Sequence, residues 1–421
     1  MGDAKAVPLL RRIARTGSPQ MRALAVLGLG LAHEKSAVTD IAAIARAVES
    51  GNVARAAAAY ALGELGAESE AATLLALAQG TDALPRQMAL VALARMGAVG
   101  APSREPPGGR AALAAMADAV FAGGDADNAR SRSTSDSLQR AGTAALVILA
   151  TPPAPAAKGK ALALAPRDTL PVPDGNIDVD AMIDALVPRN FSDKDRATAF
   201  LKYADVLQRA ALAALQTSAE RARSVLDSLG TGDGEFEPFL PKDAVTGTEA
   251  ARTKARDVAK MLEPSIIPLV RHPDPAMRTK ALVLLSRSPT QDAATAVVLG
   301  VDDASESVQR VALAAIGKQT DPRAVAAVGR LLATHENWAM RVLAAQAMGR
   351  LGAAGAAGAA ADASRALQVA ATKDKYALVR EAALEAMATY DVAAAKVLAT
   401  QMAANDPEPR VREAARAIAK R

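Results

Sequence analysis

Residues 274–285 read "DPAMRTKALVLL", and residues 406–421 close the chain with the related stretch "DPEPRVREAARAIAKR". In both stretches an acid and a proline precede an apolar residue, an arginine, and then small and apolar residues at helical spacing. Proline is tolerated in the first turn of a helix, because the N–H that it lacks would have no partner there. The shared pattern predicts a helix that starts near the proline, and it raises the question of whether this unit recurs.

The unit can be followed from the apolar residue that directly precedes the arginine. Equivalent positions are residues 21, 54, 88, 277, 308, 340, 379 and 411. Neighbouring positions are 31 to 39 residues apart, except for one large gap between residues 88 and 277. A second helical pattern precedes most of these positions, so each unit is predicted to be a pair of helices. A period in the thirties indicates stacked supersecondary units.

Two residue types mark the unit further. Arginine follows the reference position in most units, but Ala89 and Gln309 replace it in two. Glycines 30, 63, 97, 317 and 349 are predicted to close the second helices with a left-handed cap. In these residues the sequence resembles the HEAT-repeat family, particularly the short bacterial form first associated with phycobilisome lyases.

The resemblance covers about residues 3–100 and 255–421. It implies an all-α protein, a right-handed α-solenoid of stacked antiparallel helix pairs. It also implies that each repeat arginine pairs with acids or carbonyls in the loop of a neighbouring unit, which we prefer to a phosphate-binding ladder.

The period is lost in the middle of the chain. We predict N-terminal repeats in residues 1–150 and C-terminal repeats in residues 256–421. Residues 151–180 are rich in proline, which favours an extended, semi-rigid linker. Residues 181–255 are predicted to form an inserted helical subdomain. Within it, apolar residues at spacings of three and four from Ser192 to Leu229 favour one helix of roughly 50 Å.

The composition excludes several chemistries. The chain has 421 residues and no cysteine, which rules out disulfides, thiolate zinc sites and a thiol nucleophile. Its 50 basic residues are nearly balanced by 45 acidic ones, so we expect no nucleic-acid partner. Aromatic residues make up only 2%, so the core must consist mainly of Ala, Leu, Val and Met. No apolar run approaches the ~18 residues of a membrane span.

The histidines offer no zinc site. "HEKSA" from His33 and "HENWA" from His335 begin like a zinc-protease helix, but alanine stands where the second histidine belongs. We therefore interpret both stretches as turns between helices. The third histidine is His272.

"DGNIDVD" from Asp174 offers oxygens at alternate positions, as the start of an EF-hand loop does. Val179 and Ala185 occupy the glycine and glutamate positions of such a loop. A turn in which Asp178 or Asp180 caps the following helix is preferred to a calcium site. We predict no catalytic residue, no metal and no cofactor.

These observations favour a non-enzymatic scaffold that binds a partner protein or peptide along a groove lined by second helices. The candidate contact residues are Arg287, Lys318, Trp338 and Arg350. Two alternatives stay open: an enzyme of the bilin-lyase type, which the resemblance permits, and a DNA-binding solenoid. The scarcity of aromatic and histidine residues argues against a tetrapyrrole pocket. The balanced charge argues against DNA.

The protein is expected to be an elongated monomer or a subunit of a larger complex. The stretch "MGDAKAVPLLRRIARTG" lacks the apolar core of a signal peptide. If Met1 is the native start, we expect the cytoplasm. If an export signal has been trimmed, we expect the cell envelope or the periplasm.

Overall fold

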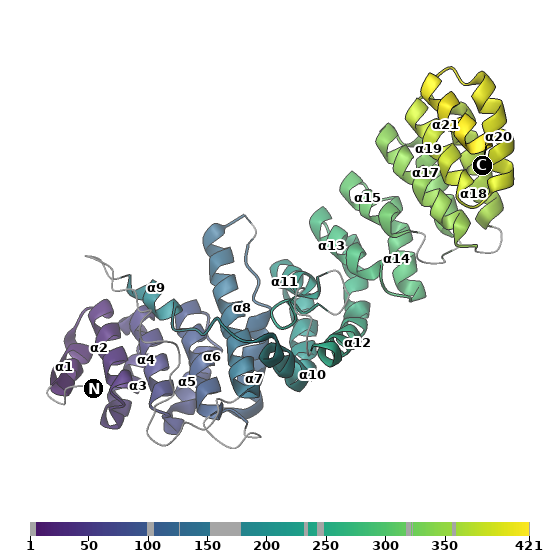
Figure 1. Ribbon diagram of the computed structural model, residues 1–421. Helices are drawn as coiled ribbons and strands as arrows, with labels where there is room; N and C mark the ends of the chain where they lie inside the picture. Colours follow the sequence, from purple (N-terminus) through teal and green to yellow (C-terminus); the bar gives the residue numbers. More distant parts are fainter. Residues whose placement is uncertain are drawn as a thin grey trace. The chain divides into compact units, whose positions relative to one another are not determined.

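The computed structural model describes residues 6–98, 105–125, 127–151, 178–230, 235–241, 248–316, 321, 323–355 and 359–420. The regular elements within these ranges are all helices (Figure 1), which confirms the predicted all-α class. The chain divides into two compact units. The first comprises Met1–Leu229 and Gly234–Ala259, and Lys260–Arg421 makes up most of the second.

The first unit begins with four stacked helix pairs. The first helix of each pair is α1 (Ala6–Thr16), α3 (Val38–Arg46), α5 (Ala71–Ala78) or α7 (Gly109–Val120). The second helix is α2 (Pro19–Leu31), α4 (Asn52–Glu64), α6 (Ala83–Ala98) or α8 (Ala129–Ala150). Each second helix packs against its own first helix and against the second helix of the next pair. The stack therefore has one layer of first helices and one of second helices.

Of the glycines expected to cap second helices, Gly317 falls outside the described residues. The other four, Gly30, Gly63, Gly97 and Gly349, lie inside their helices and none has a left-handed backbone. Gly30 and Gly63 lie inside α2 and α4 and let these helices approach their neighbours closely. A Cβ atom on Gly30 would lie 2.8 Å from Ala61 Cβ, and one on Gly63 would lie 2.7 Å from Ala92 Cβ. The left-handed residues come three positions later, at His33 (φ 53°) and Gly66 (φ 60°). The predicted caps at residues 30 and 63 are therefore wrong, because close packing of second helices requires the glycines there.

The predicted single helix from Ser192 to Leu229 is also wrong. It is two helices, α10 (Asp193–Thr217) and α11 (Ala219–Leu229), which pack against each other. The break is at Ser218, whose backbone is extended (φ −154°, ψ 160°) and whose hydroxyl accepts the N–H of Arg221 at 3.3 Å. This side-chain cap offers the backbone an alternative to a continuous helix.

Helix α10 packs on α7 and α8, so it extends the stack rather than projecting from it. It is followed by α12 (Glu249–Ile266). A short helix, α9 (Val179–Asp184), precedes α10 and begins at Asp178, whose carboxylate accepts the N–H of Ala181. The predicted cap at Asp178 is confirmed. Most of the predicted proline-rich linker, residues 152–177, lies outside the described residues.

The second unit alternates first and second helices with the repeat period. Its second helices are α13 (Pro275–Leu285), α15 (Glu306–Ala315), α17 (Trp338–Ala353), α19 (Ala377–Ala388) and α21 (Pro409–Ala419). Its first helices are α14 (Gln291–Val301), α16 (Arg323–Thr334), α18 (Ala359–Lys373) and α20 (Val392–Asn405). A continuous core of Ala, Leu, Val and Met runs from Leu282 to Ile418. Among the second helices, packing is most extensive between α17 and α19 and least extensive between α15 and α17.

Candidate protein-binding surface

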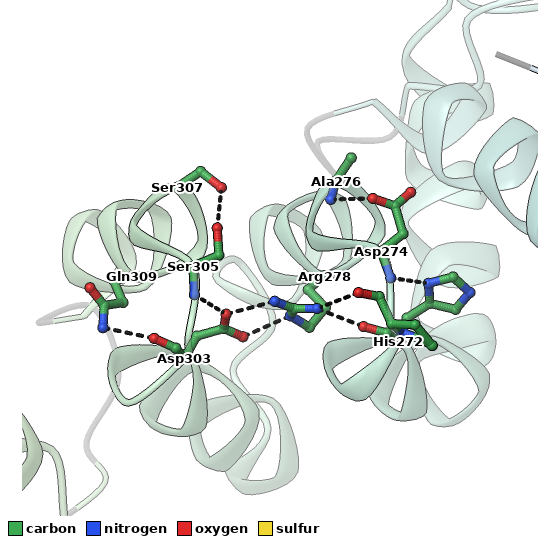
Figure 2. Close-up of polar contacts among 9 residues, drawn as sticks. His272, Asp274, Ala276, Arg278, Asp303, Ser305, Ser307 and Gln309 are labelled. Atoms are coloured by element: carbon green, nitrogen blue, oxygen red, sulfur yellow. Dashed lines mark hydrogen bonds and ion pairs between the residues drawn. The ribbon is translucent and has the colours of Figure 1, made fainter. Parts of the chain in front are cut away.

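The repeat arginine joins two successive loops of the second unit (Figure 2). Arg278, at the start of α13, donates to both carboxylate oxygens of Asp303 at 2.7 Å. It also donates to the carbonyls of His272 and Pro273 in its own loop, at 2.8 and 2.9 Å. Asp303 accepts the N–H of Ser305 at 2.8 Å as well. We call this arrangement, an arginine bonded to its own loop and to the aspartate of the next, a clasp.

The clasp recurs twice in the same unit. Arg341 donates to Asp374 at 2.7 and 3.0 Å, and Arg380 donates to both oxygens of Asp406 at 2.8 Å. Burial alone would raise the pKa of Asp374 and Asp406, but hydrogen bonds from the arginine and from a backbone N–H lower each pKa below its usual range. The arginines are therefore held within the stack, as the resemblance implied, and their charges are already matched.

One clasp of the series is missing. Gln309 occupies the arginine position of α15, and its side chain donates to the Asp303 carbonyl at 2.7 Å. Its Oε1 is buried and has no partner among the described residues. In the loop before α17, His335 occupies the position that is an aspartate in the equivalent loops of the other repeats, at Asp303, Asp374 and Asp406. Arginine and aspartate are thus replaced together, by glutamine and histidine.

His335 and His272 have the same local role. The Nδ1 atom of each accepts the backbone N–H two residues further on, from Asn337 and Asp274, at 3.1 Å. These histidines stabilise inter-helix turns, which agrees with the turn predicted for "HENWA". Within the described residues, no group of three or more histidine, aspartate or glutamate side chains is placed to hold a metal ion.

The second helices of this unit are buried on one side only. In α15, α17 and α19 the buried residues recur at helical spacing, and the remaining positions face outward. We call their exposed residues the second-helix surface. Its members are Glu306, Ser307, Arg310, Ala314, Trp338, Gln346, Arg350, Leu378 and Glu385.

An aromatic pair lies at one edge of the second-helix surface. The ring centroids of Trp338 and Tyr376 are 6.3 Å apart, and each residue is 39% exposed. Tyr376 also lies under Arg341, whose guanidinium carbon is 5.3 Å from the ring centroid. Because Arg341 belongs to a clasp, the pair is held at the N-terminal ends of α17 and α19. Leu378 adds an exposed aliphatic side chain beside it.

Three of the four residues predicted to contact a partner lie within the described part of the chain. Trp338 begins α17, and Arg350 lies twelve residues later, about 18 Å along the helix axis. Arg350 donates to the carbonyls of Leu313 and Ile316 at 2.6 and 3.4 Å, where it caps the C-terminal end of α15. Arg287 lies in the turn after α13. Lys318 falls outside the described residues.

The sequence analysis missed Tyr376. It precedes Arg380 by four residues, as Asn337 precedes Arg341, so an alignment of the repeats would have placed it beside Trp338. A separate groove of about 1070 Å³ runs between the first helices α16 and α18. Its floor includes Gly329, Ala366 and Val369, and it ends at the clasp of Arg341 and Asp374.

The fold and the clasps define a class, the α-solenoids of stacked helix pairs. Residues 297–388 match the family model described as HEAT repeats, which supports the predicted resemblance for this part of the chain. The matched range covers α15, α16, α17, α18 and α19, and it includes two of the clasp arginines and the aromatic pair.

Solved structures show a weaker likeness. Kap121p bound to Pho4p aligns with a TM-score of 0.38 and 13% identity over 99% of this chain and 45% of that chain. Kap121p without a named partner aligns with a TM-score of 0.36 and 12% sequence identity, with the same coverage. An engineered protein aligns with a TM-score of 0.34 and 15% sequence identity over 98% of each chain. This chain spans about 45% of the Kap121p chains, and TM-scores this low support no functional argument.

The search of curated proteins found no match. Among the described helices, none is both long enough and apolar enough to cross a bilayer.

Proposed function

We propose that this protein is a non-enzymatic scaffold that binds a partner protein or peptide on the second-helix surface of its second unit. The observation that carries the proposal is the exposed pair of Trp338 and Tyr376, held in place by Arg341. Aromatic and arginine side chains contribute most to binding when they sit in a pre-organised patch. In a chain with one tryptophan and four tyrosines, two aromatic residues meet on this surface.

The chemistry of the surface favours a protein over nucleic acid. Its charged residues carry both signs, with Arg310 and Arg350 beside Glu306 and Glu385. The arginines of the clasps are neutralised by their aspartates, so they add no positive stripe for a phosphate backbone. A mixed polar surface with an aromatic edge is typical of transient protein contacts.

A site-specific photo-crosslinker tests the proposal. The photoreactive amino acid replaces Leu378 in one variant and Val397, a 65% exposed residue of the first helix α20, in the control. Both variants of the full chain are irradiated in lysate of the native host, and the adducts are identified by mass spectrometry. We expect one dominant adduct from position 378 and none of the same identity from position 397.

The Trp338→Ala substitution, combined with the crosslinker at position 378, provides a second test. If the adduct at position 378 marks a specific contact, removing the tryptophan should lower its yield at least tenfold. Equal yields with and without Trp338, or the same adduct from both crosslinking positions, would contradict a scaffold that uses this surface.

A further inference from the structure

The second-helix layer of the first unit carries a short segment of the chain's own sequence. Helix α9 contacts α2 and α4, both of them second helices. Asp184, at the end of α9, pairs with Arg140 of α8 at 3.2 Å and with Arg189 at 2.9 Å. Since α8 is the second helix of the fourth pair, the segment is anchored on the same layer at two places.

The segment is amphipathic, and its apolar side packs against this layer of second helices. Val179, Ile183 and Val187 are 4%, 0% and 2% exposed, at spacings of four residues. Met182 and Leu186 are half-buried beside them, while Ala181 and Ala185 face solvent. A helix of six residues is not stable by itself, because nucleation costs more than so few hydrogen bonds return. The helical form of α9 therefore depends on the surface beneath it.

The helix beneath α9 is covered on every side. All residues of α4 from Ala54 to Gly63 are buried, a run of nearly three turns. Its first helix α3 and the second helices α2 and α6 pack against it, and α9 contacts it as well. The second helices of the second unit, in contrast, keep the exposed residues of the second-helix surface.

We propose that Asp178–Phe191 is an internal ligand bound on the second-helix layer of the first unit, and that a partner helix of the same pattern can take its place. The partner is an amphipathic helix with aliphatic residues at positions i, i+4 and i+8 and a carboxylate at i+5 that pairs with Arg140. This is the helix-in-groove mode of recognition, with the occupant supplied by the chain itself. It rests on the proposed function only in treating the solenoid as a binder of peptides.

Because the internal segment belongs to the same chain, it competes with any partner helix for the same surface. An occupant on the same chain acts at an effective concentration on the order of millimolar, so a free helix of equal affinity competes poorly with it. Binding of a partner is therefore suppressed until the internal segment is weakened or outcompeted.

A labelled peptide of residues 178–191, "DVDAMIDALVPRNF", tests the proposal by fluorescence anisotropy against the full chain. Ile183→Asp in the protein should release the internal segment, and we expect the unmodified peptide to bind this variant at least tenfold more tightly than the wild type. Ala185→Asp is the matched control, since it adds the same charge on the exposed side of the segment, and it should leave binding at the wild-type level. A folded Ile183→Asp variant, judged by circular dichroism, that binds no better than the wild type overturns the proposal.

A charge exchange gives an independent answer if Ile183→Asp prevents folding. In the Arg140→Glu chain we expect a peptide carrying Asp184→Arg to bind at least fivefold more tightly than the unmodified peptide. Equal binding of the two peptides would overturn the proposed pairing. Because these measurements concern the first unit and the crosslinks at position 378 concern the second, either proposal can fail while the other stands.

Discussion

The two units share one repeat and differ in what covers their second helices. In the first unit α4 and α6 are buried around their whole circumference over Ala54–Gly63 and Gln87–Gly97. In the second unit α15 and α19 bury one side and present residues such as Arg310 and Glu385 on the other. The sequences match these environments, because "ARAAAAYALG" is apolar on all sides, apart from the clasp-position arginine, whereas "ESVQRVALAA" is not. The same scaffold thus has a closed face in one unit and an open face in the other.

The second difference concerns how neighbouring pairs are joined. The second unit uses the clasps, whereas Arg22 of the first unit donates to the Gly17 carbonyl in its own loop and has no aspartate partner among the described residues. Arg55 pairs with Asp82 at 2.6 Å, but Asp82 is 43% exposed. Close contacts between small residues occur in both units, for example Gly63 with Ala92 and Gly349 with Ala386. Buried charge pairs occur in both as well, since Arg95 of α6 pairs with Glu64 of α4 while their side chains are 7% and 16% exposed. What distinguishes the second unit is the regular series of arginine–aspartate clasps.

The largest expected effect comes from breaking a clasp. The side chains of Arg380 and Asp406 are 9% and 5% exposed, so Arg380→Ala leaves a carboxylate buried without its partner. We expect the free energy of unfolding of the second unit to fall by about 3 kcal/mol. Arg410→Ala is the control, because Arg410 pairs with Glu381 while 64% exposed, and it should cost less than about 0.5 kcal/mol. Urea unfolding followed by circular dichroism measures both, and equal losses would contradict the distinction.

The next effect separates a glycine that permits close packing from one that does not. Gly63→Ala would place Cβ 2.7 Å from Ala92 Cβ and 2.8 Å from its Cα, and should destabilise the first unit by about 1–3 kcal/mol. Gly329→Ala in α16 meets only Met348 Cε at 3.6 Å. It should stabilise the second unit by about 0.5–1 kcal/mol through helix propensity. Thermal midpoints that move in the same direction would show that the two glycines are equivalent.

A third measurement asks whether the missing clasp can be restored. Gln309→Arg alone adds a cation near a loop that lacks an aspartate, and His335→Asp alone adds an anion without its arginine. Together they recreate the pairing seen at Arg278 and Asp303, so we expect a favourable coupling of about 1–2 kcal/mol in a double-mutant cycle. Additive effects of the two substitutions would mean that the loops around residues 309 and 335 do not meet as the other loops do.

The smallest expected effect is the acid sensitivity of a single clasp. The pKa of Asp374 is lowered in the folded protein, because hydrogen bonds from Arg341 and the Tyr376 N–H outweigh the effect of burial. A lowered folded pKa contributes stability that is present above the unfolded value of about 3.9 and is lost as the pH falls through the folded pKa. The urea midpoint should therefore fall more steeply between pH 5 and about pH 3 in the wild type than in Arg341→Gln. Parallel pH profiles would exclude this carboxylate as a source of acid sensitivity.

The repeat itself could be predicted, because helical periodicity and a spacing near 32 residues are properties of the chain alone. The class of partner for the arginines was implied by the resemblance. That Gln309 and His335 stand at the two positions of a clasp could be recognised only after the structure had shown which arginine pairs with which aspartate in the other repeats. The predicted caps at Gly30 and Gly63 were wrong because both a cap and a close contact favour glycine, and only the positions of Ala61 and Ala92 distinguish them.

The single helix from residue 192 was wrong because the apolar stripe continues across Ser218, where a local cap breaks the backbone. The position of α9 has no local signal at all. Its amphipathic pattern is visible in "VDAMIDALV", but only the fold shows that α2, α4 and α8 form its surface. The sequence also gives no sign that Arg350 donates to the carbonyl of Leu313 at the end of α15.

The missing clasp has a mechanical consequence. When a stack of helix pairs is pulled along its length, each interface acts as a spring in series, and the most compliant one opens first. The interface between α15 and α17 has the least extensive packing among the second helices of its unit, and Gln309 provides no charge pair across it. Under tension we expect the second unit to yield there. Residues 338 to 420, with the aromatic pair and two clasps, would then move as one elastic segment.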